Sequence, residues 1–380
     1  MTEQLETETL ATWHYLHTHT EISMQEWKTT AYISDRLTKM GYQVTLFKDF
    51  PGLMATFGTG RPVVGIRSDI DALYQYVDRK WQANHSCGHD ANMTIVLETA
   101  RLLMADKNQI SGTVKLIFQP AEETGEGAYA VNKIGAADDL DYFYGIHLRP
   151  IAETVNGHAE AAILHGAVRR GVGKILGEEA HAGRPQLGKN AIEAASQLVS
   201  ALAEIHLDPL VAYSVKMTSI KAGNAVNIIP GEADFTLDLR AASNDQMNKL
   251  IAAIRQRTKG VALACETKIN IDFDQGTPAS VADPTAIAIL EKSIVAQLGQ
   301  AGLDKPKQSS GGDDFNVYGV EHPNLKSTML GLGCDLKPGL HAPNMAFNHD
   351  ALVPGIKILE NAVLQTFHLS LQHQEDHLIN

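Results

Sequence analysis

The pattern of apolar and polar residues changes period several times along the first 150 residues of the chain. Residues 3–17 and the segment EWKTTAYISDRLTKM are predicted to be helices, and Gly41 provides a stop for the second. Further helices are predicted after Asp90, where apolar residues recur at helical spacing, and near residues 128–134. Short apolar runs predict strands at residues 43–47, 53–57, 62–66, 113–118 and 141–148. Alternating strands and helices are typical of a mostly parallel α/β sheet covered by helices on both faces.

A different order of elements begins near residue 167. The next six segments are predicted to be strand, helix, strand, strand, helix and strand, at residues 168–176, 190–206, 211–220, 232–240, 245–258 and 263–273. This β-α-β-β-α-β order is typical of a ferredoxin-like α+β domain.

After Pro278 the α/β pattern resumes. The elements expected there are a helix at 285–298, a strand at 327–332 and a long final helix from Ala351. The simplest domain organisation is one α/β domain in two parts, residues 1–166 and 277–380. A smaller domain of residues 167–276 is inserted between these parts, and its length suits a compact domain.

The composition is that of an ordinary folded protein and argues against two classes of partner. The 380 residues are 44% hydrophobic and 20% charged, and the formal net charge of −12 would repel nucleic-acid phosphates. No run of about 18 apolar residues is present, so we expect no contact with a membrane through a spanning helix. The start, MTEQLETETL, does not resemble a secretory signal. Because Cys87, Cys265 and Cys334 do not suggest a disulfide framework, the expected location is the cytoplasm.

The segment His85-Ser-Cys-Gly-His-Asp90 combines two types of metal ligand just before a predicted helix. Cys87 and His89 lie two positions apart, so in an extended segment both side chains can point the same way. Thiolate and imidazole both suit Zn²⁺ or a similar divalent ion. Asp90 can cap the helix, orient His89 through its second ring nitrogen, or do both. Taken alone, the segment can also be a buried cysteine beside a capped helix.

Two adjacent carboxylates follow the predicted strand TVKLIF, in the segment Gln119-Pro-Ala-Glu-Glu123. Their negative charges repel each other unless a cation or a shared proton compensates. One carboxylate can bind a metal ion while the other takes a proton from a metal-bound water. Taken alone, the segment can also be a solvated acidic turn.

Two histidines occupy comparable places. His147 lies at the end of the apolar run DYFYGIHL, and His341 lies in the loop Gly-Leu-His-Ala-Pro between a strand and a helix. Each alone is more often a hydrogen-bonded structural histidine. However, all four segments lie at equivalent places in the α/β pattern, where such folds position their sites. One cysteine, three histidines and one or two glutamates are enough ligands for two metal ions with open positions for water and substrate.

These segments resemble the dinuclear-metal aminoacylase/carboxypeptidase metallopeptidase family, in its branch of hippuricase-like and auxin-conjugate-hydrolase-like amidohydrolases. The pairing of HSCGHD with FQPAEE is specific to this branch. The match covers nearly the whole chain in one order, through LHTHTEIS, GIRSDIDAL, HSCGHD, FQPAEETGEGA, GIHLRP, AHAGRP, GNAVNIIPG, GGDDF and GLHAPNMAFNHDAL. The resemblance implies a metal-dependent hydrolase that cuts the amide bond of small N-acyl amino acids or related amides. Its cofactors would be two divalent metal ions, Zn²⁺ or Mn²⁺.

Carried over residue by residue, the resemblance assigns roles in the α/β domain, which becomes the catalytic domain. Glu122 is implied to be the general base that activates a water molecule and returns its proton to the leaving amine. Asp69 and Asp71 are implied to support the metal ligands from behind, a role also considered for Asp90. The implied metal ligands are Cys87, His89, Glu123, His147 and His341.

The inserted domain becomes, by the same resemblance, a lid and dimerisation domain. His181 resembles a histidine that reaches into the site of a neighbouring subunit and steadies the oxyanion, which implies a homodimer or higher homo-oligomer. Asn227 matches a substrate-binding asparagine, and Arg240 is a candidate clamp for a substrate carboxylate. Glu178 and Glu179 replace a turn that is glycine-rich in relatives; they either weaken binding of an anionic substrate or face the solvent.

Three alternatives accompany this interpretation: a dipeptidase or carboxypeptidase of the same family, a metal-binding scaffold without activity, and a zinc-stabilised structural module. The complete ligand set together with Glu122 argues against a scaffold. A structural module would have ligands close in sequence, whereas these extend from residue 87 to residue 341. The sequence leaves the acyl group and the amine open. The thiolate favours Zn²⁺, while the carboxylate and imidazoles suit Mn²⁺ equally.

Overall fold

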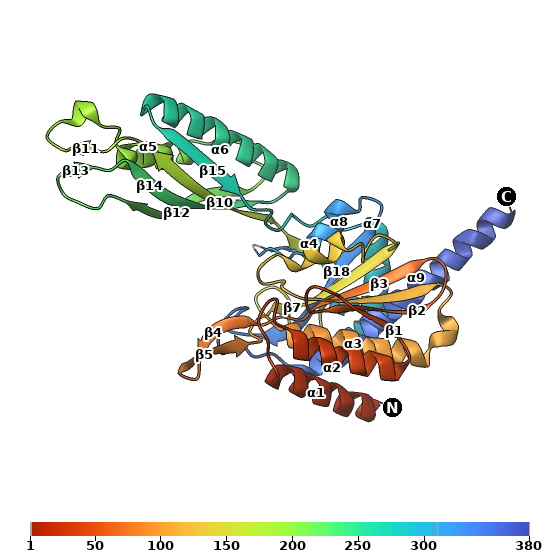
Figure 1. Cartoon of the computed structure of the whole chain (residues 1–380). Helices are drawn as coiled ribbons and strands as arrows, with labels where there is room; N and C mark the ends of the chain where they lie inside the picture. The colour runs from red at the N-terminus through yellow and green to blue at the C-terminus, as the bar shows by residue number, and fades with distance from the viewer. Residues whose placement is uncertain (1, 310, 380) are drawn as a thin grey trace. The chain divides into compact units, whose positions relative to one another are not determined.

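The chain folds into two compact units in a computed structural model that describes residues 2–309 and 311–379 (Figure 1). The large unit consists of Met1–Leu164, Val281–Gln308 and Asp314–Asn380. The small unit consists of His165–Ser280 and Ser309–Asp313. The insertion thus begins two residues before the predicted 167 and ends four residues after the predicted 276, and a short later segment joins it.

The large unit is built on an eight-stranded sheet. Its strands are β1 (Gln43–Leu46), β2 (Leu53–Gly58), β3 (Val63–Asp69), β6 (Thr113–Gln119), β7 (Tyr142–Pro150), β8 (Ala159–Glu160), β16 (Leu303–Asp304) and β18 (Lys326–Leu336). The strand order is β1-β2-β6-β3-β7-β18-β8-β16. The four central strands β6, β3, β7 and β18 are parallel neighbours, whereas β1 and β2 pair antiparallel at one edge. The predicted α/β class with a mostly parallel sheet is confirmed.

Helices cover both faces of this sheet. One face packs against α1 (Thr2–Thr18), α2 (Trp27–Met40), α3 (His89–Ala105), α7 (Pro284–Leu298) and α9 (Leu352–Ile379), and the other against α4 (Gly127–Lys133) and α8 (Asn316–Glu321). Successive residues of a strand point to opposite faces, so in β7 Tyr144 packs on the first group and Phe143 on the second. Double coverage explains why β7 is one continuous apolar run. Among the helices that the structure describes, none is long and apolar enough to span a membrane.

A hairpin absent from the predicted elements joins β3 to α3. It consists of β4 (Leu73–Val77) and β5 (Lys80–Asn84), which pair antiparallel. Tyr74 and Trp81 stack on its exposed surface, with ring centroids 5.6 Å apart. Its other face supports the loop that follows β18, because the Gln75 side chain donates a hydrogen bond to the His341 carbonyl oxygen at 2.8 Å.

The small unit has the predicted β-α-β-β-α-β order. Its elements are β10 (Ala167–Leu176), α5 (Ala191–Ala203), β12 (Tyr213–Ala222), β14 (Glu232–Ala241), α6 (Asn244–Ala264) and β15 (Lys268–Phe273). The antiparallel sheet has the order β12-β14-β10-β15, and α5 and α6 cover one of its faces (Figure 1). Phe235, Leu237 and Leu239 of β14 are buried in this core, while the residues between them point to the other face. The predicted ferredoxin-like domain is confirmed.

The largest differences from the predicted boundaries of this unit lie between its second helix, expected to end at residue 258, and its last strand. The strand expected at 263–273 begins only at Lys268, because α6 continues to Ala264. Val261 is buried in the core, and the backbone N–H of Thr267 donates to the Ala262 carbonyl oxygen at 2.9 Å. Alanine and leucine favour helix, so the segment VALA extends α6 once its apolar face is packed.

Four short strands complete the fold. They are β9 (Leu164–His165), β11 (Ala180–His181), β13 (Ile228–Ile229) and β17 (Gln308–Ser309). β11 and β13 form a separate two-stranded sheet in the small unit. At the root of the insertion, the chain entering it and the chain leaving it lie side by side. Val168 N–H donates to the Thr277 carbonyl oxygen at 2.8 Å, and Thr277 N–H donates to the Val168 carbonyl oxygen at 3.0 Å.

The core of the small unit makes one glycine sensitive to substitution. A Cβ atom on Gly173 would lie 2.2 Å from the ring of Phe235, which is only 2% exposed and cannot move aside. Gly173→Ala is therefore expected to destabilise the small unit by about 1–3 kcal/mol, as overpacking does. Urea unfolding of the variant and the wild type would measure this loss. The neighbouring Val172→Ala, on the exposed face, is the control and should change stability by less than about 0.5 kcal/mol. Equal unfolding midpoints for Gly173→Ala and the wild type would contradict the packing argument.

Candidate functional site

The candidate residues of the large unit lie at one edge of its sheet. Asp69 ends β3, Glu122 and Glu123 follow β6, His147 lies near the end of β7, and His341 follows β18. These four strands are parallel neighbours, so their carboxyl ends meet at the same edge, which is where open α/β sheets place their sites. The remaining donors enter from the start of α3.

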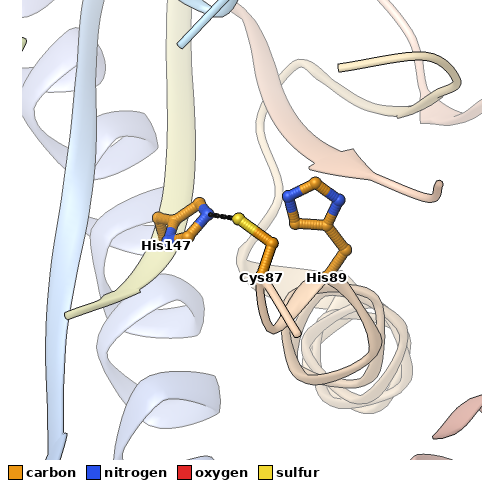
Figure 2. Close-up of side chains that lie close together, drawn as sticks. All are labelled: Cys87, His89 and His147. Carbon is orange, nitrogen blue, oxygen red and sulfur yellow. Dashed lines mark hydrogen bonds between the residues drawn. The ribbon is translucent and has the colours of Figure 1, made fainter. Parts of the chain in front are cut away.

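Cys87 lies between two of the predicted histidine ligands. Its Sγ atom is 3.5 Å from His147 Nε2 and 3.3 Å from His341 Nε2. Figure 2 shows Cys87 pointing toward His147, with His89 beside them at the start of α3. The donor atoms of Cys87, His89 and His147 all lie within 4.8 Å of one another. The chain therefore brings a thiol and three imidazoles together although Cys87 and His341 are 254 residues apart.

The two glutamates complete this group. Glu123 Oε2 is 3.4 Å from His341 Nε2, and Glu123 Oε1 is 3.9 Å from His89 Nε2. Glu122 Oε2 lies 3.8 Å from His89 Nε2. Two further sets of donor atoms within 4.8 Å of one another result, Cys87 with Glu123 and His341, and His89 with both glutamates. The predicted ligands and the predicted base thus form one continuous group.

Two buried atoms of this group test whether it suits metal ions. His89 Nε2 and Glu123 Oε1 are buried and make no hydrogen bond among the described residues. Unpaired buried polar atoms are costly and rare in folded proteins. Both residues belong to donor sets together with a thiol, and thiolate, imidazole and carboxylate are all ligands of Zn²⁺. The residues therefore fit divalent cations.

The electrostatics of the group lead to the same conclusion. Burial opposes the charged form of His89, but the negative charges of Asp69 and Cys87 outweigh it and raise the pKa of the ring. Burial raises the pKa of the Cys87 thiol, and the charge of Glu123 adds to this. Burial also raises the pKa of Glu123 to about 7. Anionic groups are concentrated here in a desolvated place, and a bound cation would offset that cost.

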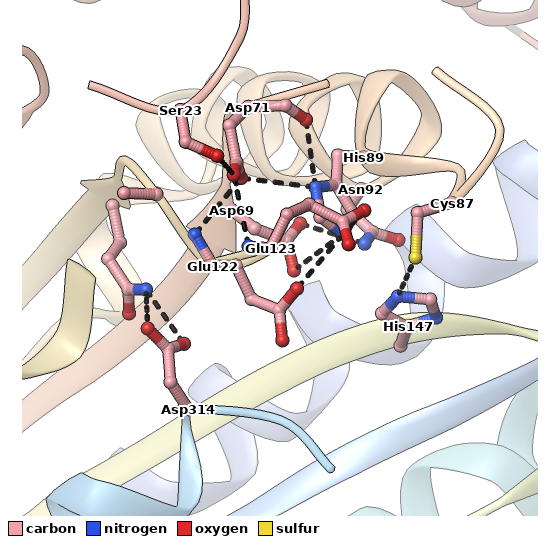
Figure 3. A network of polar contacts seen from close by, with 12 residues as sticks. Ser23, Asp69, Asp71, Cys87, His89, Asn92, Glu122, Glu123, His147 and Asp314 are labelled. Carbon is pink, nitrogen blue, oxygen red and sulfur yellow. Dashed lines mark hydrogen bonds and ion pairs between the residues drawn. The ribbon is translucent and has the colours of Figure 1, made fainter. Parts of the chain in front are cut away.

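Asp71 and Asp69 support His89 from two sides (Figure 3). The Nδ1 atom of His89 lies 2.9 Å from the Asp71 carbonyl oxygen, so its other nitrogen is directed into the site. Asp69 Oδ2 is 3.6 Å from His89 Nε2 and accepts a hydrogen bond from Arg67 Nη1 at 2.7 Å. Asn92 donates to the other Asp69 oxygen at 2.9 Å. Such outer contacts fix the orientation of a ligating histidine.

Asp90 does not orient His89, in contrast to one of the roles considered for it. Its carboxylate lies 2.7 Å from His17 Nδ1 and accepts the backbone N–H of Ala91. The N-cap position of α3 is Gly88, and Asp90 lies within the first turn. Consecutive residues of a helix point in directions about 100° apart, so Asp90 faces away from the ring of His89.

The candidate residues of the small unit fall into two places. His181 in β11 and Asn227 next to β13 are exposed neighbours, because Ala182 N–H donates to the Asn227 carbonyl oxygen at 2.9 Å. The Gly183 N–H donates to His181 Nδ1 at 2.9 Å, so the proton of the neutral ring lies on Nε2. Arg240 lies elsewhere, in β14, where its Nε is 3.1 Å from Asp238.

Sequence reasoning missed a buried polar network beneath the glutamates. Arg67 is fully buried and donates through Nη2 to Asp314 at 2.6 Å. Gln119 at the end of β6 donates to both oxygens of Asp314 at 2.8 Å. An arginine within an otherwise apolar strand was the available signal, because a charge there requires a buried partner. The partner itself lies 247 residues away and gives no local signal.

Comparisons with known proteins place these features in a family. The model of peptidase family M20/M25/M40 matches residues 65–365. The chain is 28% identical to N-acetyl-L-cysteine deacetylase of Bacillus subtilis, over 92% of this chain and 86% of that protein. It is also 28% identical to the IAA-amino acid hydrolase ILR1-like 2 of Arabidopsis thaliana, over 92% of this chain and 83% of that protein.

A solved structure shows the same fold. The crystal structure of the Bacillus subtilis YXEP protein, described as a dinuclear metal binding peptidase, superposes with a TM-score of 0.84 at 24% identity. The superposition covers 97% of this chain and 99% of that one.

Metal binding provides a direct test of the donor group. His89→Ala removes a buried donor that belongs to two of the donor sets described above, and we expect it to weaken Zn²⁺ binding by more than about 100-fold, beyond the loss typical of outer contacts. Competition with a chromophoric chelator would measure this affinity. His158→Ala is the matched control, because His158 also lies beside a carboxylate, Asp304 at 3.0 Å, but belongs to none of the donor sets described. Equal Zn²⁺ affinity in both variants would contradict the assignment.

Proposed function

The chain belongs to peptidase family M20/M25/M40, and we propose that it hydrolyses the amide bond of small N-acyl amino acids or related amides with two bound divalent metal ions. The observation that carries the proposal is the position of Glu122. This carboxylate lies beside a complete group of metal donors, with its Oε2 3.8 Å from His89 Nε2. The names of two relatives, a deacetylase of N-acetyl-L-cysteine and a hydrolase of IAA-amino acids, support this substrate class.

The proposed ligands are Cys87, His89, Glu123, His147 and His341. Bound at these donors, divalent ions supply Lewis acidity, which polarises the amide carbonyl and lowers the pKa of water. The thiol of Cys87 favours Zn²⁺, and the remaining donors also suit Mn²⁺. A ligating thiol must stay reduced, and Cys87, Cys265 and Cys334 are all free. We therefore place the reaction in the cytoplasm, where thiols are kept reduced.

The residues of the chain account for the proton movements of hydrolysis. Glu122 accepts a proton from the attacking water as the water oxygen bonds to the amide carbon. The C–N bond then breaks, and Glu122 returns the proton to the leaving nitrogen, so the carboxylate ends as it began. Asp71 holds the turn that carries Glu122, because the N–H groups of Glu122 and Glu123 donate to its two oxygens at 3.2 and 3.0 Å.

The small unit is proposed to act on the site of a neighbouring subunit in a homodimer or higher homo-oligomer. His181 Nε2–H can donate to the oxyanion, since Nδ1 is already occupied by Gly183. Asn227 and Arg240 are proposed to bind the substrate. β12 supports dimerisation through this unit: it lies at an edge of its sheet, pairs only with β14 among the described strands, and exposes Ile220. An open edge is a ready surface for pairing with a second copy.

A substrate screen on Zn²⁺- or Mn²⁺-loaded protein, with N-acetyl amino acids and dipeptides, tests the reaction. Glu122→Gln is expected to keep its metal content and to lose about 10²–10⁴-fold in kcat, because an amide cannot accept the proton. The control is Glu126→Gln, an exposed glutamate of the same loop, which should retain full activity.

The screen also separates the alternatives. Preferential turnover of dipeptides would indicate a dipeptidase of the same family. A metal-loaded wild type that turns over nothing would indicate an inactive scaffold. Undiminished hydrolysis by Glu122→Gln would show that Glu122 is not the base.

Mixed subunits test the role of His181. Both His181→Ala and Glu122→Gln homodimers are expected to be nearly inactive. If His181 serves the partner's site, a random mixture should recover about a quarter of wild-type activity, because half of the dimers are hybrids with one complete site. Coexpression of the two variants and measurement of kcat would show this recovery. A mixture no more active than its parents would rule out action across subunits.

A further inference from the structure

Two buried carboxylates bind the turn that carries the catalytic glutamates. Three successive backbone N–H groups, those of Ala121, Glu122 and Glu123, donate to side chains beneath them. Ala121 N–H donates to Glu26 Oε1 at 2.9 Å, and the next two donate to Asp71. The directions of both glutamate side chains therefore depend on contacts that hold their backbone.

The first residue of this turn has an unfavourable backbone conformation. Ala121 has φ of +54°, in the left-handed region that residues with a Cβ rarely adopt. Such a conformation costs on the order of 1 kcal/mol or more and persists only where the surroundings enforce it. Here the Ala121 N–H is bonded to Glu26, and its carbonyl oxygen accepts the N–H of Gly127 at 3.1 Å. The carbonyl side of Ala121 is bonded within its own loop, whereas the bond to Glu26 ties its N–H to a distant segment.

Glu26 is itself held in place by its own segment. It is fully buried at the start of α2, and its carbonyl oxygen accepts the Thr30 hydroxyl at 2.6 Å. Just before it, Glu21 accepts both the N–H and the hydroxyl of Thr29, at 2.8 and 3.0 Å. Ser23 donates to Asp71 at 2.7 Å. Residues 21–30 therefore form a fixed support against the catalytic turn.

The chemistry of Glu26 indicates that it acts as a hydrogen-bond acceptor rather than as a charge. Burial, reinforced by the negative charge of Asp71, raises the pKa of Glu26 to about 8. Its Oε2 atom makes no hydrogen bond among the described residues. A neutral carboxyl still accepts from Ala121 N–H through its carbonyl oxygen, as a glutamine side chain would. Glu26 therefore binds the turn without adding charge to the acidic group above it.

We propose that Glu26 is a positioning residue for hydrolysis, which holds Ala121 in its left-handed conformation and thereby directs Glu122 toward the substrate and Glu123 toward the metal ions. This inference rests on the proposed function of Glu122 and Glu123. Glu26 itself touches neither the substrate nor the reacting atoms.

The test compares an acceptor with a non-acceptor at position 26. Glu26→Gln preserves the hydrogen bond, and we expect it to retain kcat within about threefold of wild type, consistent with a replaced rather than a lost partner. Glu26→Leu leaves Ala121 N–H buried and unpaired. It is expected to lose about 10- to 100-fold in kcat on an N-acetyl amino acid, with KM changed much less, and to weaken Zn²⁺ binding by about 10-fold. Glu160→Leu is the matched control, because Glu160 is also a buried carboxylate that accepts a backbone N–H, that of Lys307 at 3.2 Å, but it does not contact the turn, so this variant should keep both values.

A glycine at position 121 separates positioning from general stability. Glycine adopts positive φ without strain, so Ala121→Gly should make the turn less dependent on residue 26. In a double-mutant cycle, Glu26→Leu is expected to lower kcat and Zn²⁺ affinity much less when residue 121 is glycine than when it is alanine. The double variant Glu26→Leu/Ala121→Gly should therefore nearly match Ala121→Gly alone. If Glu26→Leu alone does not fold, the effect of residue 26 is measured by comparing Ala121→Gly with Glu26→Leu/Ala121→Gly.

Three results would overturn the proposal. They are full activity and Zn²⁺ affinity in folded Glu26→Leu, an equal loss in Glu26→Gln, and additive losses in the cycle. If the wild type hydrolyses no amide, the proposed function fails instead, and the Zn²⁺ affinities of the same variants still decide the role of Glu26.

Discussion

The gathering of anionic groups around one buried imidazole is the constraint on which the large unit depends. Asp69, Asp71 and the two glutamates all lie near His89 in a desolvated place, where unpaired charges are costly. Hydrogen-bond donors offset this cost for two of the carboxylates: buried Arg67 donates to Asp69, and backbone N–H groups donate to Asp71. In the proposed enzyme, bound metal ions also compensate the negative charge. These compensating groups come from different strands and loops, so the site forms only when the parallel sheet has brought those strands together.

Elements with strong local patterns could be predicted from the sequence. The α/β sheet and the ferredoxin-like unit could be predicted from periodicity, because burial of one or both faces of a strand requires apolar residues at regular positions in its sequence. The metal donors were recognisable because thiol, imidazole and carboxylate groups follow strands whose ends must meet. The predicted start of the strand at 263 was wrong because the alanines and leucine of VALA favour helix, and this segment extends α6 once Val261 is packed in the core.

Contacts that depend on distant partners could not be predicted. Asp90 was a reasonable support for His89 by proximity, but helix geometry turns it toward His17. The hairpin of β4 and β5 was not predicted, because its polar pattern is irregular; the pairing of its two strands establishes it. Glu26 resembled any acidic residue at a helix start. Its role depends on a backbone N–H 95 residues away, for which the chain carries no local signal.

The paired hydrogen bonds between Val168 and Thr277 have a consequence for how such a protein can diversify. They tie the entering and leaving parts of the chain together at the base of the inserted segment, residues 165–280, so a change beyond them leaves both ends of the insertion in place. The inserted segment can then be lengthened, shortened or exchanged as a cassette while the sheet that carries the metal donors keeps its register. Selectivity for new substrates can thus evolve in one module without retuning the chemistry of the other.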